Sequence, residues 1–120
     1  MKREYRDYVR DILEAINKAE EFVSGMKFQD FEKDDKTLFA VIRALGIIGE
    51  AVKNIPDSLR VPYKSIPWKE ISGMRDKLVH EYFGVNEKVV WNTVKEDLPL
   101  LKKVVIKVLA DLEKSSSSES

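Results

Sequence analysis

Apolar residues recur every three or four positions along the first part of the chain. Because an α-helix repeats every ~3.6 residues, residues at this spacing lie on one face of a helix. The pattern predicts a long amphipathic helix that closes near Gly25, then a loop over 27–36 in which Asp34 or Asp35 caps the next helix. The stripe consists of Tyr5, Tyr8, Val9, Ile12, Ile16, Ala19, Val23 and Met26.

The following stretch, residues 36–54, carries apolar residues on two sides. A narrow polar strip that includes Arg43 and Glu50 separates the two stripes. A helix of this kind is buried on both sides. Either its own chain covers it, with Arg43 and Glu50 as a local ion pair, or part of it faces a second copy of the protein. One stripe is Leu38, Val41, Ile42, Leu45, Ile48, Val52 and Ile55, and the other is Ala40, Ala44, Ile47 and Ala51.

Three prolines, Pro56, Pro62 and Pro67, predict a connector and then a third helix that starts near Pro67 and frays before Gly84. Asn86 is the expected cap of a fourth helix, and Pro99 either kinks that helix or opens a new one. The inward residues are expected to be Trp68, Ile71, Met74 and Leu78 in the third helix, Val89, Val90, Thr93, Val94 and Leu98 in the fourth, and Leu101, Val104, Val105, Val108, Leu109 and Leu112 after Pro99.

No stretch alternates apolar and polar residues as a strand does, so the sequence predicts an all-α, antiparallel bundle of four or five helices. The chain of 120 residues, 43% apolar and 35% charged, is typical of one soluble globular domain. We expect that domain to cover residues 1–114. The serine-rich residues 115–120 are expected to be a disordered tail.

Several classes of protein are excluded by what the sequence lacks. No apolar run approaches the ~20 residues of a membrane span and the first residues lack an apolar signal segment, so we expect a cytoplasmic protein without membrane contact. The chain has no cysteine and one histidine, His80. This excludes disulfides, thiolate metal sites and a cysteine nucleophile, and it predicts neither a metal site nor a cofactor.

Charge is balanced overall but uneven along the chain. The 21 basic residues cancel the 21 acidic ones, and a neutral balance by itself disfavours nucleic-acid binding. Between Ser58 and His80, however, basic residues exceed acidic ones by three. A solvated surface explains this excess as well as a nucleic-acid site does. The basic residues are Arg60, Lys64, Lys69, Arg75 and Lys77, and the acidic ones are Glu70 and Asp76.

The candidate chemistry lies around the single histidine. Arg75, Asp76, His80 and Tyr82 form an R-x-x-x-x-H-x-Y run, and no phosphate-binding loop, nucleophile elbow or zinc motif occurs elsewhere. Residues 66–84 resemble the signature of HepT-like HEPN proteins, and the segments starting at Arg43 and Val90 resemble further family segments in the expected order. The resemblance covers nearly the whole chain except the serine tail.

The resemblance implies a homodimeric, HEPN-type helical toxin that cleaves RNA as a ribonuclease. It also implies a partner, a minimal nucleotidyltransferase that acts as antitoxin. In the family, this antitoxin attaches adenylyl groups to the motif tyrosine, which corresponds to Tyr82. Asp76 and Tyr82 are then supporting residues of the site, and Arg43 and Glu50 either line the cleft or form salt bridges at an interface.

The residue types suit metal-independent RNA cleavage. His80 is suited to act as base or acid because an unperturbed imidazole has a pKa near ~6.5. Arg75 can grip two phosphate oxygens and stabilise their charge. Tyr82 can bind the phosphate or orient the imidazole, and Asp76 can orient the ring.

On a regular helix Arg75 and His80 point about 140° apart. Either the helix loosens near His80, or the site is completed across a two-fold axis, where two copies also supply two histidines.

Two other functions stay open. The chain can be a non-catalytic HEPN subunit that binds a nucleotidyltransferase, although its intact motif argues against this. A purely structural helical dimer explains the apolar second helix but leaves Arg75, His80 and Tyr82 without a role. In that case His80 is a helix-terminal histidine that bonds to a carbonyl or to Asp76.

Overall fold

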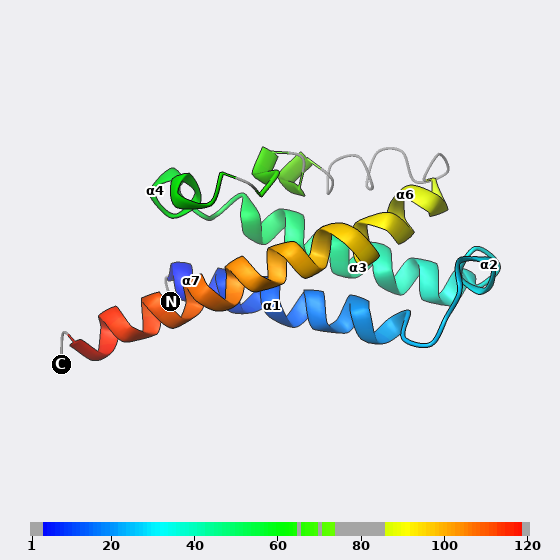
Figure 1. Cartoon of the computed structure of the whole chain (residues 1–120), viewed down its shortest axis with the longest axis horizontal. Helices are drawn as coiled ribbons and strands as arrows, with labels where there is room; N and C mark the ends of the chain where they lie inside the picture. The colour runs from blue at the N-terminus through cyan, green and yellow to red at the C-terminus, as the bar shows by residue number, and fades with distance from the viewer. Residues whose placement is uncertain (1–3, 65, 70, 74–85, 119–120) are drawn as a thin grey trace.

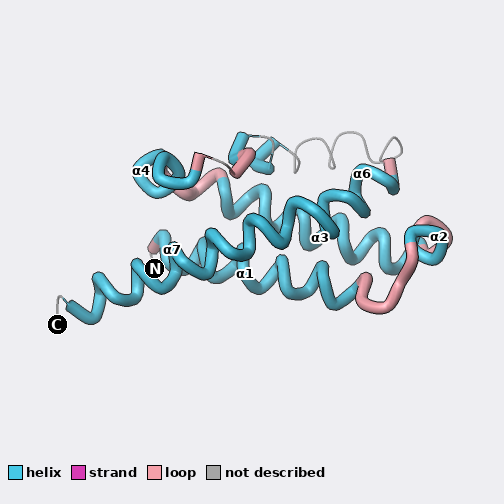
Figure 2. The backbone as a smooth tube through the Cα atoms, in the orientation of Figure 1, coloured by secondary structure: helices cyan, strands magenta, loops and turns pink. Residues whose placement is uncertain are grey.

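The computed structural model describes residues 4–64, 66–69, 71–73 and 86–118, and it confirms an all-α fold. Three long helices lie side by side: α1 (Tyr5–Phe22), α3 (Asp35–Val52) and α7 (Leu98–Ser118). Helix α3 runs back along α1, and α7 runs in the same direction as α3 (Figure 1). Within the described ranges every remaining segment is a short helix, a turn or a loop, and none is a strand (Figure 2).

Helix α1 forms where the apolar stripe predicts it. Its buried face packs on α3 and α7, and the Glu4 amide at its start donates to Asp7 Oδ2 at 3.1 Å. The chain turns at Gly25, whose φ of 78° favours glycine. Tyr5, expected on the inner face, is instead 52% exposed because it lies at the helix end. The buried residues are Val9, Ile12, Ala15, Ile16 and Ala19.

The predicted loop over 27–36 contains a short helix, α2 (Phe28–Phe31), so that part of the prediction is wrong. Phe31 is fully buried and holds this turn against the core. Four residues are too few to show a helical period, which is why the pattern missed them. The expected cap of α3 is confirmed: Asp34 Oδ1 accepts the Thr37 amide at 3.0 Å, and Oδ2 accepts the Thr37 hydroxyl at 2.7 Å.

Helix α3 is apolar on two sides, as predicted, but neither side is fully buried, since Leu38 and Ile42 of the first stripe are half-buried. Its second stripe is partly open, because Ala40 and Ile47 are half-buried and the neighbouring Phe39 is 47% exposed. Arg43 and Glu50 are both exposed on this helix. The buried residues of α3 are Val41, Ala44, Leu45, Ile48, Gly49, Ala51 and Val52.

The proline-rich connector is compact, with one turn of α4 (Asp57–Arg60) followed by a 3-10 turn, η1 (Val61–Tyr63). The third helix starts at the predicted place, since residues 68–69 and 71–73 are helical and the Ile71 amide donates to the Pro67 carbonyl at 3.0 Å. Ile71 is buried as predicted. The expectations for Met74, Leu78 and Gly84 lie outside the described residues.

The C-terminal helical segment runs through α6 (Glu87–Asn92), a π-helical turn, η3 (Thr93–Asp97), and α7. Asn86 caps it as predicted, because its Oδ1 accepts the amides of Lys88 at 2.9 Å and Val89 at 3.2 Å. The helix continues past Pro99, and the Leu98 amide reaches back to the Thr93 carbonyl. The wider π turn makes room for the ring of Pro99, whose backbone nitrogen carries no hydrogen to donate.

Two expectations for this segment differ from the structure. Val89 was expected inside but is 57% exposed, because the inward face of α6 is occupied by Val90 and Val94. Helix α7 continues to Ser118 and thus into the segment expected to be disordered. Propagating a helix adds one hydrogen bond per residue, and serine opposes it only weakly. The boundary of the domain at residue 114 stays a prediction.

Candidate active site

The four motif residues predicted to carry the chemistry, Arg75, Asp76, His80 and Tyr82, lie outside the described residues. The described chain brackets them on both sides, with Gly73 before the motif and Asn86 after it. Covalent geometry keeps the Cα atom of Arg75 within about 7 Å of Gly73, and that of Tyr82 within about 14 Å of Asn86. The surfaces around Gly73 and Asn86 therefore border the candidate site.

The N-terminal border is held in place by side-chain hydrogen bonds to backbone carbonyls. Arg60 Nη2 donates to Val52 O at 2.6 Å, and its Nε donates to Ile55 O at 2.9 Å. These bonds satisfy carbonyls at the end of α3. Trp68 Nε1 donates to Tyr63 O at 3.0 Å, which ties the start of the third helix to the connector. The segment that leads to Arg75 is thus anchored at two points.

The C-terminal border is an aromatic cluster that the sequence pattern did not predict. The Trp91 ring lies 5.2 Å from the Phe31 ring and 6.1 Å from the Phe28 ring, between centroids. Lys88 Nζ lies 4.4 Å from the centre of the Phe28 ring, and Lys95 Nζ lies 4.9 Å from that of Trp91. The sequence held one signal for this cluster, because Trp91 and Lys95 are spaced one helical turn apart.

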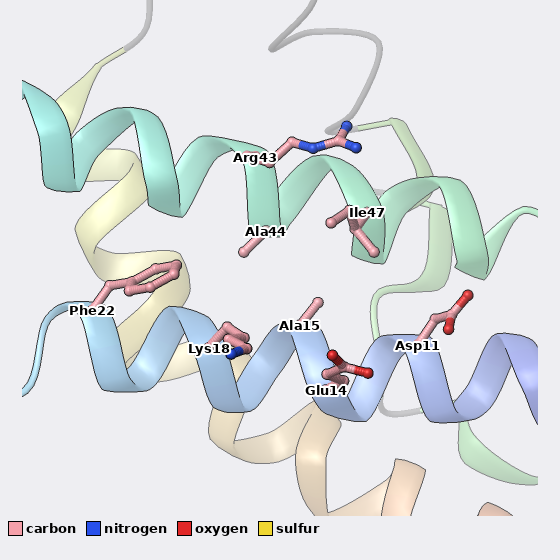
Figure 3. A pocket seen from close by; sticks show the side chains of 8 residues that line it. All are labelled: Asp11, Glu14, Ala15, Lys18, Phe22, Arg43, Ala44 and Ile47. Atoms are coloured by element: carbon pink, nitrogen blue, oxygen red, sulfur yellow. The ribbon is translucent and has the colours of Figure 1, made fainter.

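Arg43 and Glu50, the two supporting residues on α3, lie on one side of that helix because seven residues make about two turns. Arg43 lines a groove of about 440 Å³ between α1 and α3, and Glu50 is not among the lining residues. Figure 3 shows the charged lining residues: Asp11, Glu14 and Lys18 come from α1, and Arg43 comes from α3. The apolar lining residues are Ala15, Phe22, Ala44 and Ile47.

The groove mixes two acids with two bases, so it presents no single sign of charge. Its floor is built from small residues, since Ala15 and Ala44 are both buried where the helices meet (Figure 3). Such a surface suits a protein partner of mixed charge better than a polyanion. The structure thus brings Arg43 together with Asp11, Glu14 and Lys18, which the sequence pattern did not single out.

Two carboxyl groups in the described part have perturbed acidity. The hydrogen bonds from the Thr37 side chain and backbone lower the pKa of Asp34, as a helix cap should. Burial, followed by repulsion from Glu96, raises the pKa of Asp97, which lies in the π turn beside Pro99.

The described residues also bear on two other kinds of site. Among them, no group of three or more histidine, cysteine, aspartate or glutamate side chains is placed to hold a metal ion. Within the same part of the chain, no helix is long and apolar enough to cross a membrane.

Comparisons with known proteins agree on one family. The family model described as "Ribonuclease HepT-like" matches residues 12–108. A protein of Thermococcus cleftensis named "Probable ribonuclease HepT" is 58% identical over 102 residues, which are 85% of this chain and 93% of that relative. No solved structure gives a significant match.

Two further relatives extend the similarity to other organisms. A "Putative RNase" of Caldanaerobacter subterraneus subsp. tengcongensis is 48% identical over 104 residues, covering 87% of this chain and 93% of its own length. Another "Putative RNase", from Methanocaldococcus jannaschii, is 43% identical over 112 residues, or 93% of each chain. Since the family model spans α1 to α7 and includes the whole R-x-x-x-x-H-x-Y run, this chain belongs to the HepT-like ribonuclease family.

Proposed function

We propose that the protein is a metal-independent endoribonuclease toxin that acts in the cytoplasm and needs no cofactor. The observation that carries the proposal is the complete R-x-x-x-x-H-x-Y run at Arg75 to Tyr82, inside the segment that matches a ribonuclease family. An arginine and a histidine supply the charge stabilisation and the proton transfer that RNA cleavage needs without a metal ion.

The proposed reaction uses the ribose 2′-hydroxyl of the substrate as nucleophile. His80 takes its proton, the 2′-oxygen bonds to phosphorus, and the bond from phosphorus to the 5′-oxygen breaks. A second acid returns a proton to the leaving 5′-oxygen. Arg75 holds the phosphoryl oxygens as their negative charge grows. Asp76 and Tyr82 position the imidazole and the phosphate. The products are a 2′,3′-cyclic phosphate and a 5′-hydroxyl.

We place this site at a two-fold interface, where Arg75 of one copy works beside His80 of the other. A regular helix would separate these two side chains by about 140° within one chain, and pairing across a two-fold axis removes this constraint. The partly open second stripe of α3, with Arg43 and Glu50 exposed beside it, supports a surface that another copy covers.

The proposed partner is a minimal nucleotidyltransferase that acts as antitoxin and adenylylates Tyr82. An adenylyl group on this side chain adds bulk and negative charge next to Arg75 and His80, which would exclude the RNA phosphate. Intact mass measurement after co-expression with a minimal nucleotidyltransferase of this kind tests this step. An unmodified Tyr82 in a protein whose toxicity is neutralised would show that inhibition works by binding alone.

The proposal is tested by cleavage of total RNA in EDTA. Wild type should cleave, whereas Arg75→Ala and His80→Ala should each lose at least about 100-fold in rate, as expected for loss of a charge-stabilising or proton-transferring group. The matched control is Lys33→Ala, an exposed lysine remote in sequence from the motif, which should cleave as wild type does. Equal activity in all four proteins would reject the proposed roles. No cleavage by any of them would favour the non-catalytic binding subunit.

A further inference from the structure

Two lysines of α7 and the proline-rich connector together form a basic surface at the N-terminal border of the motif. We define the connector patch as Tyr63, Lys64, Lys103 and Lys107. We infer that this patch binds the substrate strand by its phosphates and one base, and guides it to the motif. The inference rests on the proposed function for the identity of its ligand, single-stranded RNA.

The patch carries three lysines, and one acidic residue, Asp111, follows one turn after Lys107 on α7. Lys64, Lys103 and Lys107 are exposed and form no ion pair with another described residue. By contrast Lys102, on the side of α7 that meets α1, bonds Glu20 at 3.0 Å. Residues 98–110 contain three lysines and no acid. Lys103 and Lys107 lie one turn apart, so their like charges repel each other, and Asp111 one turn further on offsets part of this repulsion.

An aromatic ring lies within this basic surface. Lys107 Nζ is 5.8 Å from the centre of the Tyr63 ring, so the connector and α7 meet here although they are far apart in sequence. Tyr63 is half-buried and packs against the core, while Lys64 beside it is exposed. Surfaces that bind single strands combine lysines for the phosphates with aromatic rings on which bases stack.

The connector is held in shape before any ligand binds. The guanidinium of Arg60 is occupied by the carbonyls of Val52 and Ile55, and the indole of Trp68 by the carbonyl of Tyr63. Tyr63 and Lys64 lie between these two anchors, so ordering them costs little on binding. Arg60 is not counted in the patch because its Nε and Nη2 already donate to these carbonyls.

The patch is close enough to the motif for one strand to reach both. Trp68, which bonds Tyr63, precedes Arg75 by seven residues, and an extended chain of that length spans at most about 25 Å. Single-strand-binding domains contact about 4–16 nucleotides, which suffices for this distance. The patch thus extends the substrate contact beyond the reacting phosphate.

Two other surfaces suit RNA less well. The groove between α1 and α3 carries Asp11 and Glu14 beside its bases. The aromatic cluster of α6 has Lys88 and Lys95 over its rings, but residues 87–97 carry three acids, Glu87, Glu96 and Asp97, against these two lysines. The connector patch combines an aromatic ring with three lysines, and Asp111 is the one acid within a turn of its lysines on α7.

The test measures binding of a fluorescent single-stranded RNA to the full chain in the His80→Ala background, at several salt concentrations. Lys103→Gln/Lys107→Gln removes two charges, and Lys33→Gln/Lys114→Gln is the control with the same charge change at exposed sites. Loss of two phosphate contacts should reduce the salt slope of log affinity by about 1.4. The control should keep the parent slope. Thermal melting of each variant checks that it folds.

A second variant, Tyr63→Leu, keeps an apolar side chain under Lys107 but removes the stacking face. It should weaken RNA binding about 5- to 100-fold without changing the salt slope, since stacking involves no counterion release. Equal slopes for the patch variant and the control would overturn the inference, as would a parent protein that binds no RNA. So would unchanged RNA binding combined with lost binding to the partner nucleotidyltransferase, because the patch would then be a protein-binding surface.

Different results would reject the catalytic roles and the connector patch. If His80→Ala cleaves RNA as wild type does, the catalytic assignment is wrong, while the slope measurement still decides the patch. If cleavage depends on His80 but the patch variants bind RNA like the control, the catalytic proposal stands and the patch is rejected.

Discussion

The guanidinium of Arg60 reaches the end of α3, where its Nη2 lies 2.6 Å from the Val52 carbonyl oxygen. Its Nε donates to Ile55 O as well, so one side chain bonds two carbonyls and fixes the connector that leads to the motif. Carbonyls at a helix end need such partners when the helix itself cannot supply them.

We expect Arg60→Ala to lower the free energy of unfolding by about 2 kcal/mol, because two charge-assisted hydrogen bonds of a part-buried group are lost. Arg60→Lys should recover less than half of this loss, since an ammonium lacks the planar fork that reaches both carbonyls. Urea unfolding measures both variants. A lysine variant as stable as wild type would show that charge alone suffices here.

The Asn86 cap gives a second stability prediction. Asn86→Ala should cost about 1 kcal/mol, because the amides of Lys88 and Val89 lose their acceptor at the start of α6. Asn86→Asp should retain the cap, since a carboxylate accepts the same bonds. The alanine and aspartate variants are compared by thermal melting. Equal melting temperatures for both would argue against the cap.

Asp97 gives a prediction for pH. Burial and Glu96 raise its pKa in the folded state, so folding is favoured by its protonated form. The contribution of the Asp97 carboxyl to the free energy of unfolding is fully present when the pH is below its pKa in the unfolded chain. It is lost as pH rises through its pKa in the folded state. Asp97→Asn should therefore stabilise the protein at pH 7.

The gain from Asp97→Asn should shrink toward zero as pH falls below about 4, the range where an unfolded aspartate is protonated. Chemical unfolding at pH 3, 5 and 7 measures it, with Glu96→Gln as the control for charge alone. A gain that is the same at all three values would contradict the raised pKa.

The long helices were predictable because their apolar residues repeat over several turns. Asp34 and Asn86 were predictable as caps because a short polar side chain precedes each repeat. The π turn before Pro99 was not predictable, since it depends on how a proline is accommodated within a packed helix. The exposure of Val89 was not predictable either, since it depends on which face of α6 turns toward the core. Helix α2 was missed because its one buried anchor, Phe31, gives no period.

The candidate site likewise has a part that the sequence predicts and a part that only the structure shows. The sequence alone names Arg75, Asp76, His80 and Tyr82, because they form a local motif, and their geometry stays a prediction. The structure adds what local patterns do not contain. Lys107 meets Tyr63, and Arg43 comes to line one groove with Asp11 and Glu14, only after the chain folds back on itself.

Mixing two inactive variants tests the composite site. If Arg75 of one copy works beside His80 of the other, dimers that combine Arg75→Ala with His80→Ala contain one intact site. Random exchange should then recover at most about one quarter of the wild-type activity. The control mixes Arg75→Ala with itself. No recovery, despite subunit exchange shown by native mass spectrometry, would place both residues in one chain.

The central claim is that this chain cleaves RNA by attack of the 2′-hydroxyl without a metal ion. The most direct measurement is the chemistry of the ends that the purified wild type produces from a defined RNA in EDTA. We expect a 2′,3′-cyclic phosphate and a 5′-hydroxyl at the cut ends. An RNA in which hydrogen replaces the 2′-hydroxyl at the cut site should not be cleaved. Cleavage that requires added Mg²⁺ and leaves a 5′-phosphate would contradict this claim.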